Sequence, residues 1–459
     1  MDAMLLQAAA ERLAAMREGL DTPFAARLMG LVGLATMIGL AWLLSSNRKR
    51  VNWRLVAAGV VLQAVFGFLV LKTPVGREIF EAANAVFLKL LGFTERGAAF
   101  LFGNLVRDNV PVGVPVGEPN DTAPITSGEY WANTGASFAF SVLPTIIFFS
   151  SLMSVLYYLR VMEWIVKGIA WVMHRTMRTS GAETLSVAGN IFVGATESPL
   201  LIKPFISGMT QSELNTVMVG GFATIAGGVM AAYVGMLSPH FPDIAGHLLT
   251  ASVMNAPAAL LISKILLPET GEPATRSSVN ISVPKEDANL IDAAAAGAAQ
   301  GLRLALNVGA MLLAFIALIE LANAVVGAVG GVLGRPELSL QMILGWVMSP
   351  LAWLMGVPWA DAGEVGELMG IKAVVNEFVA YLQLAGSLEA GTTLSPRAVL
   401  IATYALLGFA NFGTIAIQIG GIGGLAPERR SDLSRLGLRA MIGGNLAAYM
   451  SASLAGMIL

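Results

Sequence analysis

Two short polar segments interrupt an otherwise apolar sequence, and each contains a carboxylate. The first, residues 190–199, contains Glu197, and the second, residues 375–381, contains Glu377. A carboxylate at membrane depth is costly, so by default it marks a substrate, ion or proton site. One such segment in each half of the chain predicts a transporter with its binding site near the membrane midplane. Further hydrogen-bonding side chains on the same or the following segments are Asn190, Thr196, Asn376, Asn411 and Thr414.

The composition indicates a membrane protein with many spans. Of the 459 residues, 56% are hydrophobic and 13% are charged, whereas a soluble protein carries about 25% charged residues. The chain has no cysteine, which excludes disulfides, thiolate metal sites and a cysteine nucleophile. The three histidines are scattered, and the net charge of −2 gives no basic surface for nucleic acid.

The length and composition predict a helical bundle of about ten membrane segments, since each needs about 20 residues, and the apolar runs along the chain give eight expected spans. Two loops rich in Arg and Lys, at residues 48–54 and 429–439, predict cytoplasmic loops. Residues 1–27 contain four acids and no apolar core, so we interpret them as a leader rather than a signal peptide. The expected spans are 28–44, 55–71, 137–159, 214–237, 244–267, 293–333, 399–419 and 436–459.

Other segments are too short, amphipathic or interrupted to be plain spans. Residues 77–91, 160–178 and 338–359 are expected to be interfacial helices. The polar residues 93–135 are expected outside, and 268–292 form a polar loop. Interrupted backbone at membrane depth must line protein or a cavity, so residues 184–208 and 362–387 are expected to form re-entrant hairpins.

A weak internal repeat supports two related halves. Residues 221–224 read GFAT after the first acidic hairpin, and residues 408–411 read GFAN after the second. Each half then has the order of a polar hairpin, a span broken by glycine and small polar residues, and another span. Paired interruptions of this kind point to a transport site.

The motifs at these positions resemble those of the concentrative nucleoside transporter family, over nearly everything after residue 28. Several long motifs occur in the family's order, which makes the resemblance specific. They are residues 143–151, 190–199, 307–312, 376–381 and 404–411.

The resemblance implies a homotrimer in a bacterial inner membrane that imports nucleosides such as uridine and adenosine with Na⁺. It implies an all-α polytopic protein with eight spans, three interfacial helices, two re-entrant hairpins and an elevator-like transport core built as an inverted repeat. The expected units are a leader (1–27), scaffold and interfacial helices (28–178), a first transport half (179–267), a loop with a scaffold span and interfacial helix (268–359), and a second transport half (360–459).

The resemblance also implies roles for individual residues. The nucleobase is expected to face Thr196, Glu197 and Val229, with Phe409 beside the nucleoside. The ribose is expected to contact Glu377, Asn411 and Thr414. The Na⁺ ligands implied in the same way are Asn190, Val193, Thr224 and Ile225, the apolar members through backbone carbonyls.

The chain departs from the family pattern at one base-facing position. Ala195 stands where the family usually has glutamine, so one hydrogen bond to the base is missing and the preference between purines and pyrimidines is left open. Thr224 and Thr414 stand where serine is familiar, and both keep a hydroxyl.

Three alternatives remain open from the sequence. One is a proton-coupled carrier that uses Glu197 or Glu377 as the relay, and another is a passive channel. The third is an intramembrane enzyme that uses the same two carboxylates as acid and base, although no nucleophile or metal constellation accompanies them. A purely structural role would pair each acid with Lys203 or Lys372.

Overall fold

The computed structural model describes residues 23–107, 109–112, 130–133, 138–276, 287–391 and 394–459. These residues are nearly all helical, which confirms the predicted fold class. They also contain one antiparallel ribbon of two short strands, β1 (Asn109–Val112) and β2 (Tyr130–Asn133). Most of the expected leader lies outside the described residues, but α2 (Phe24–Leu43) already begins within it, directly after Pro23.

Seven helical segments of the described chain are long and apolar enough to cross a membrane. The eighth expected span, residues 399–419, is instead two shorter apolar helices, α16 (Pro396–Leu406) and α17 (Phe412–Leu425). The seven comprise α2, α3 (Trp53–Lys72), α5 (Leu143–Tyr158) with the turn before it, α9 (Gln211–Ala223) joined to α10 (Gly227–Leu237), α11 (Ile244–Leu266), α12 (Leu290–Val332) and α18 (Arg430–Ile458).

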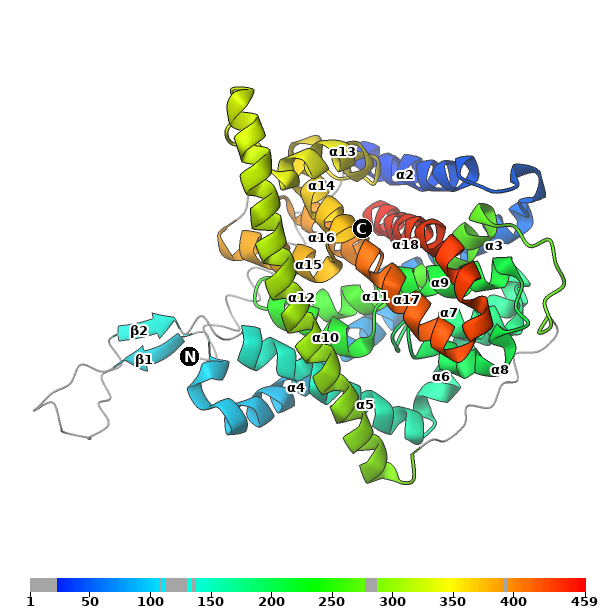
Figure 1. Ribbon diagram of the computed structural model, residues 1–459, viewed down its shortest axis with the longest axis horizontal. Coiled ribbons are helices and arrows are strands. Elements are labelled where there is room, and N and C mark those ends of the chain that lie inside the picture. The colour runs from blue at the N-terminus through cyan, green and yellow to red at the C-terminus, as the bar shows by residue number, and fades with distance from the viewer. Residues whose placement is uncertain (1–22, 108, 113–129, 134–137, 277–286, 392–393) are drawn as a thin grey trace, which may run out of the picture.

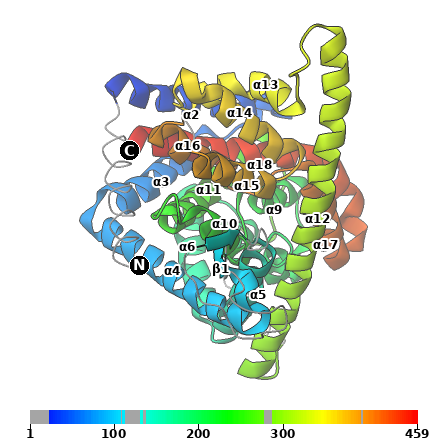
Figure 2. The same ribbon diagram turned by 90° about the vertical axis from the view of Figure 1, so that its left-hand side faces the viewer.

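The long helix α12 crosses the front of the molecule from top to bottom in Figure 1 and runs along one edge of it in Figure 2. Its 43 residues correspond to about 65 Å of helix, about twice the thickness of a hydrocarbon core of about 30 Å. It packs along α5, and glycines permit the close approach, because a Cβ on Gly301 would lie 2.7 Å from the Ile147 Cα atom.

Both segments expected to be hairpins consist of short helices joined by a tight connection. The first contains α7 (Gly181–Gly189), a 3-10 helix η4 (Ser198–Ile202) and α8 (Lys203–Ile206), and α7 packs against η4. The second contains α14 (Trp359–Val374) and α15 (Glu377–Glu389). The Asn376 side chain caps α15 by accepting a 2.8 Å hydrogen bond from the Val379 amide.

The two broken spans meet at their breaks. The first is interrupted at residues 224–226 and the second at residues 407–411. Gly408 in the second break has φ of +108° and packs directly on the first, because a Cβ at this position would lie 2.6 Å from the Phe222 carbonyl oxygen. Glycine is therefore required here both by the backbone conformation and by the space.

The four-residue repeat marks equivalent places in these two breaks. The third residue of each copy, Ala223 or Ala410, accepts a hydrogen bond from an asparagine of the helix that follows the broken span. Asn255 of α11 donates to the Ala223 oxygen at 2.6 Å, and Asn445 of α18 donates to the Ala410 oxygen at 2.9 Å. These amides satisfy carbonyls freed where the helices stop, as apolar surroundings demand.

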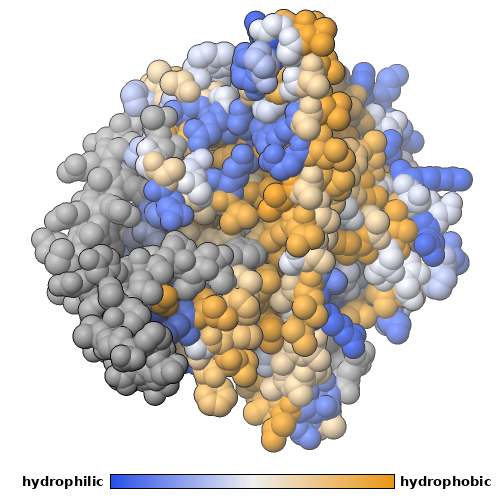
Figure 3. All heavy atoms as spheres, turned by 60° about the vertical axis from the view of Figure 1, so that its left-hand side comes forward, coloured by the Kyte–Doolittle hydropathy of each residue, from blue (hydrophilic) through white to orange (hydrophobic). Residues whose placement is uncertain are grey.

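The repeat halves form the buried centre of the molecule. In the most apolar 18-residue stretch of each span, 94% of the residues are buried in α9–α10, whereas only 6% are buried in α12. Figure 3 shows hydrophobic residues as a band along one face, with hydrophilic residues gathered towards its edges. Around the centre lie α2, α3, α4 (Pro74–Phe102), α6 (Val161–Met177) and α13 (Leu340–Leu354), with turns η1 (Arg48–Arg50), η2 (Gly103–Val106), η3 (Phe138–Val142) and η5 (Pro427–Arg429).

One predicted boundary is wrong. Residues 93–102 were expected to belong to an outer polar segment, but α4 continues through them and ends at Gly103, which has φ of +58°. Glu95 and Arg96 are exposed while Thr94 and Ala98 are buried, so the helical period continues where the composition becomes polar. Residues 113–129 of that segment lie outside the described part of the chain.

Candidate functional site

A central cavity of about 250 Å³ lies where both hairpin segments, both broken spans and α12 meet. All seven residues that the sequence proposed for substrate contact line it, although they come from segments more than 200 residues apart. They are Thr196, Glu197, Val229, Glu377, Phe409, Asn411 and Thr414. The family resemblance thus implied a set of residues that the fold brings to one place.

Glu377 is the centre of a hydrogen-bonded cluster at one end of the central cavity. Its side chain is buried, and its Oε1 accepts a 3.1 Å hydrogen bond from the Tyr233 hydroxyl. Its Oε2 accepts a 2.9 Å hydrogen bond from the Asn411 amide. The Asn411 Oδ1 in turn accepts hydrogen bonds from the Thr414 backbone amide at 2.9 Å and hydroxyl at 3.1 Å. The cluster holds the carboxylate in a fixed orientation.

Two helices begin at this cluster. Glu377 is the first residue of α15, and Asn411 is the N-cap of α17. The backbone N–H groups at a helix N-terminus favour negative charge and hydrogen-bond acceptors. Half-helices that start at mid-membrane place those ends beside a substrate, so the broken second span directly explains the polarity of this end of the cavity.

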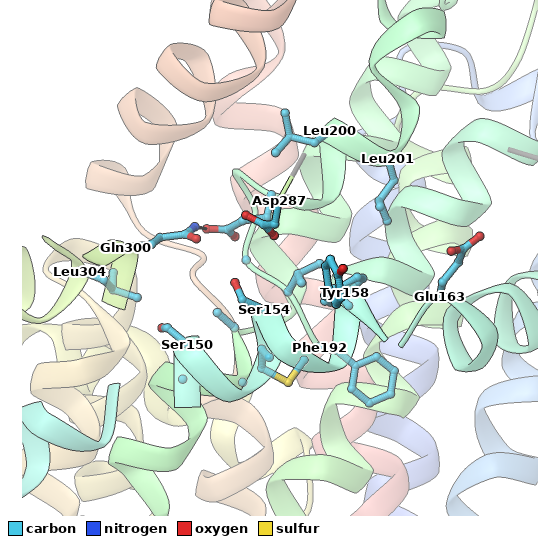
Figure 4. A pocket seen from close by; sticks show the side chains of 18 of the residues that line it. Ser150, Ser154, Tyr158, Glu163, Phe192, Leu200, Leu201, Asp287, Gln300 and Leu304 are labelled. Carbon is cyan, nitrogen blue, oxygen red and sulfur yellow. Dashed lines mark hydrogen bonds between the residues drawn. The ribbon is translucent and has the colours of Figure 1, made fainter. Parts of the chain in front are cut away.

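Glu197 occupies the other polar end of the central cavity, where an adjoining pocket of about 430 Å³ opens. Its Oε1 accepts a 2.7 Å hydrogen bond from the Gln300 amide of α12, and its Oε2 is buried without a hydrogen-bond partner among the described residues. Figure 4 shows Gln300 and Leu304 projecting from one side of this pocket, opposite Leu200 and Leu201. The second carboxylate oxygen is therefore an unfilled acceptor buried beside Gly194 of the first hairpin segment.

The remaining wall of the central cavity is apolar. Its largely hydrocarbon surface suits an aromatic ring carried between hydrogen-bonding groups. Phe409 lies in the second break and Val229 in the first turn of α10, while α12 contributes Leu304, Val308, Met311, Leu312 and Phe315.

The residues expected to bind Na⁺ lie where the first hairpin segment meets the first break. The Phe192 carbonyl accepts a 2.9 Å hydrogen bond from the Gly227 amide, which brings the neighbouring Val193 beside the break containing Thr224 and Ile225. Asn190 is buried, and neither its amide nitrogen nor its amide oxygen has a partner among the described residues. A buried oxygen without a donor fits a hard cation such as Na⁺.

Sequence reasoning missed two polar residues of the site. Tyr233 sits in an apolar run of α10 and binds Glu377 across 144 positions in sequence, so no local pattern indicated it. Gln300 precedes the motif at residues 307–312 on α12 and lies 103 positions from Glu197. The only sequence signal for Gln300 was its position about two helical turns before that motif, on the same face of the helix.

Comparison with known proteins assigns the chain to a family. Residues 247–456 match the family model described as "Na+ dependent nucleoside transporter C-terminus", and residues 32–105 match the N-terminal model of the same name. Residues 139–240 match a model described as "Nucleoside recognition". The chain belongs to the Na⁺-dependent nucleoside transporter family. The family consists of transporters rather than enzymes, and its coupling ion is Na⁺.

Individual relatives match nearly the whole chain. The chain is 42% identical over 435 residues to an uncharacterized transporter of Haemophilus influenzae, covering 94% of this chain and 98% of that protein. It is 41% identical over 445 residues to sodium/nucleoside cotransporter 1 of Rattus norvegicus, covering 94% of this chain and 64% of that protein.

Solved structures extend the likeness to the fold. The chain resembles CNTnw in an inward-facing substrate-bound state with 43% identity and a TM-score of 0.82, covering 94% of this chain and 98% of that one. It also resembles a CNTnw variant in an outward-facing state, with a TM-score of 0.84 and coverage of 95% and 98%. Structures of CNTnw and its variant in inward-facing and outward-facing states support transport by alternating access.

Proposed function

We propose that this transporter imports nucleosides, including uridine and adenosine, across a bacterial inner membrane together with Na⁺. The observation that carries the proposal is the central cavity, which joins two polar ends across an apolar wall. The test is uptake of a radiolabelled nucleoside panel into proteoliposomes, with an inward Na⁺ gradient or with choline at the same pH. A proton-coupled carrier would instead respond to a pH gradient without Na⁺, and a passive channel would show no accumulation.

In this proposal the ribose lies at the Glu377 end. A carboxylate accepts hydrogen bonds from two hydroxyls, and Asn411 and Thr414 extend the same cluster. Tyr233 holds the carboxylate from the side of α10. The base lies towards Thr196, Glu197 and Val229, with the aromatic ring of Phe409 beside the nucleoside.

We place the coupled Na⁺ among Asn190, Val193, Thr224 and Ile225. Three features support this place: the unpartnered Asn190 amide, the end of half-helix α9, and the contact between the hairpin loop and the break. Ends of half-helices and unwound carbonyls are the usual cation ligands of such transporters. Substrate and Na⁺ are then held by the same hairpin, which provides a route for coupling.

Asn190→Ala is expected to raise the Na⁺ concentration for half-maximal uptake by roughly tenfold, because one oxygen ligand is lost. Nucleoside affinity measured at saturating Na⁺ should change little. The measurement is a Na⁺ titration of uridine uptake, with Asn84→Ala on α4 as a control at an amide outside the site. An unchanged Na⁺ requirement would remove Asn190 from the ion site.

Ala195→Gln is expected to change the ratio of uridine to adenosine affinity severalfold, because one polar contact is worth about 1 kcal/mol. Ala195 lines the central cavity, and its methyl group faces Gly221, where a Cβ would lie 2.9 Å away. We expect the longer amide to extend into the central cavity towards the base. Competition by a nucleoside series against labelled uridine measures the ratio in both proteins. Identical ratios would show that position 195 lies away from the base.

We propose an elevator-like movement in which the two transport halves, 179–267 and 360–459, move against a scaffold from 28–178 and 268–359. The fixed part centres on the closely packed α5–α12 pair, of which α12 borders the central cavity and α5 borders the adjoining pocket. Helices α2 and α3, which also belong to this scaffold, pack against α18 and α11 of the moving part.

Spin labels test this division, because the chain has no native cysteine. A pair at Val332 of α12 and Glu389 of α15 should change its distance when Na⁺ and uridine are added. A control pair at Val332 and Leu159, which follows α5, should keep its distance. Equal changes in both pairs would contradict the division.

We also propose that the protein works as a homotrimer in the bilayer. The apolar outer side chains of α12 need either lipid or a neighbouring subunit to cover them. Exposed examples are Leu306, Leu313, Leu318, Leu321, Val325 and Val329. Native mass spectrometry of the detergent-solubilised protein gives the subunit number directly.

A further inference from the structure

The Glu197 carboxylate of the first hairpin segment is held from α12 as well as from its own hairpin. Its Oε1 atom accepts a 2.7 Å hydrogen bond from the Gln300 amide of α12. Its Oε2 atom lies against Gly194, because a Cβ added to that glycine would collide with it. The carboxylate is therefore fixed between the hairpin and α12, and Gln300 is one of the groups that set its orientation.

Gln300 lies beside the place where the central cavity and the adjoining pocket join. The residues that line both spaces are Gly194, Glu197, Ala226 and Leu304. Leu304 follows Gln300 by four residues, so both side chains lie on one face of α12, and Figure 4 shows them projecting from the same side of the pocket. A ligand group that reaches the Glu197 end of the central cavity therefore comes close to the Gln300 amide.

The Gln300 amide keeps hydrogen-bonding capacity for a ligand. One of its N–H groups binds Glu197, and a primary amide has a second N–H donor and an oxygen acceptor. The side chain is exposed, so a ligand in the pocket has access to both. An ionised carboxylate only accepts hydrogen bonds, so the amide adds a donor beside the Glu197 acceptor. The edge of a nucleobase carries donors and acceptors side by side and is recognised by such a pair.

The hairpin residues that line the Glu197 end of the central cavity, 194–197, include no amide. Ala195 contributes a methyl group, and Val229 of α10 adds only hydrocarbon. The glutamine that the family usually has at position 195 is missing, while a glutamine of α12 contacts the carboxylate two residues further along the hairpin. At this end of the cavity the amide therefore comes from α12 rather than from the hairpin.

We infer that Gln300 reads the edge of the nucleobase from α12 and is a specificity-determining residue of this transporter. The inference rests on the proposed function and deepens it by assigning the group that recognises the base. With uridine, the remaining N–H of Gln300 donates to the O4 atom while Glu197 accepts from N3–H. With adenosine, the amide oxygen accepts from the 6-amino group. One rotatable amide thus serves a pyrimidine and a purine.

The first experiment replaces the amide by hydrocarbon of similar size in Gln300→Leu. Displacement of labelled uridine at saturating Na⁺ gives the affinities of uridine and of pyrimidin-2-one riboside, which lacks the O4 atom and the N3 hydrogen. The preference for uridine should fall severalfold in the variant, because one of two base contacts is lost. The preference for uridine over 2′-deoxyuridine should not change, because the ribose lies at the Glu377 end.

The two ratios separate reading of the base from support of the hairpin. An unchanged preference over pyrimidin-2-one riboside, or an equal fall in both ratios, would overturn the inference, since Gln300 would then only hold Glu197 in place. A wild-type protein that binds no uridine would instead overturn the proposed function. Gln300→Ser removes the amide without adding an apolar group and should give the same ratios, so the test does not depend on one variant.

The second experiment returns the amide to the hairpin. Adding Ala195→Gln to Gln300→Leu should restore the preference for uridine over pyrimidin-2-one riboside at least severalfold. A double variant that keeps the low preference of Gln300→Leu would contradict the claim that both positions reach the same edge of the base. Gln383→Leu is the matched control, because this amide of α15 lines neither cavity, and it should keep both wild-type ratios.

Discussion

Replacement of Glu377 by glutamine is expected to weaken nucleoside binding by at least about tenfold, because hydrogen bonds to a charged group are worth about 1.5–3 kcal/mol each. The carboxylate accepts hydrogen bonds from both Tyr233 and Asn411. Glutamine keeps the shape but has one acceptor atom and one donor group. Either Tyr233 or Asn411 would then face the donor group of the glutamine side chain. The ribose would also lose its charged acceptor.

The measurement is uridine binding by isothermal titration or by displacement of a labelled nucleoside at saturating Na⁺. Glu389→Gln makes the same chemical change at the exposed end of the same helix α15 and should leave affinity unchanged. Ribose analogues that lack one hydroxyl should lose less affinity in the Glu377→Gln protein than in the wild type. If the variant binds uridine as tightly as the wild type, Glu377 does not hold the ribose.

The carboxylates of the site were predictable because their signal is local. An acid within an apolar run is rare enough at membrane depth to identify a site by itself. Glu197 and Glu377 both meet that condition, and both line the central cavity. The short repeat in residues 221–224 and 408–411 predicted the interruptions for a similar reason, because glycine and small polar residues weaken a helix where they stand.

The partners of those carboxylates were not predictable from any local pattern. Tyr233 and Gln300 reach Glu377 and Glu197 from other helices, and which of many polar residues does so depends on helix rotation and crossing. Lys372 was available only as a possible partner of Glu377, whereas its ammonium group binds backbone carbonyls of α16. Composition also misplaced the end of α4, because charged residues on an exposed helix face resemble a polar loop.

Replacement of Gly408 by alanine is expected to destabilise the protein by about 3 kcal/mol or more, because a strained backbone and an overpacked site each cost about 1–3 kcal/mol. The residue has φ of +108°, and an added Cβ would lie 2.6 Å and 2.8 Å from the carbonyl oxygens of Phe222 and Ala223. These oxygens belong to the backbone of the other broken span, so no side chain can turn away. The two breaks would have to separate.

Separation would disturb the apolar wall and the Glu377 end of the central cavity at once, since Phe409 and Asn411 follow Gly408 by one and three residues and line those two parts. Gly408→Ala should therefore lose uptake and show a lower melting temperature in detergent, by roughly 5 °C or more. Gly386→Ala is the matched control, because an added Cβ there meets nothing within 4 Å and alanine in a helix interior is favoured by about 0.5–1 kcal/mol. Equal melting temperatures and equal uptake in the Gly408→Ala and Gly386→Ala proteins would mean that the two breaks do not need the close approach at Gly408. The idea that this contact couples the two halves would then have to be abandoned.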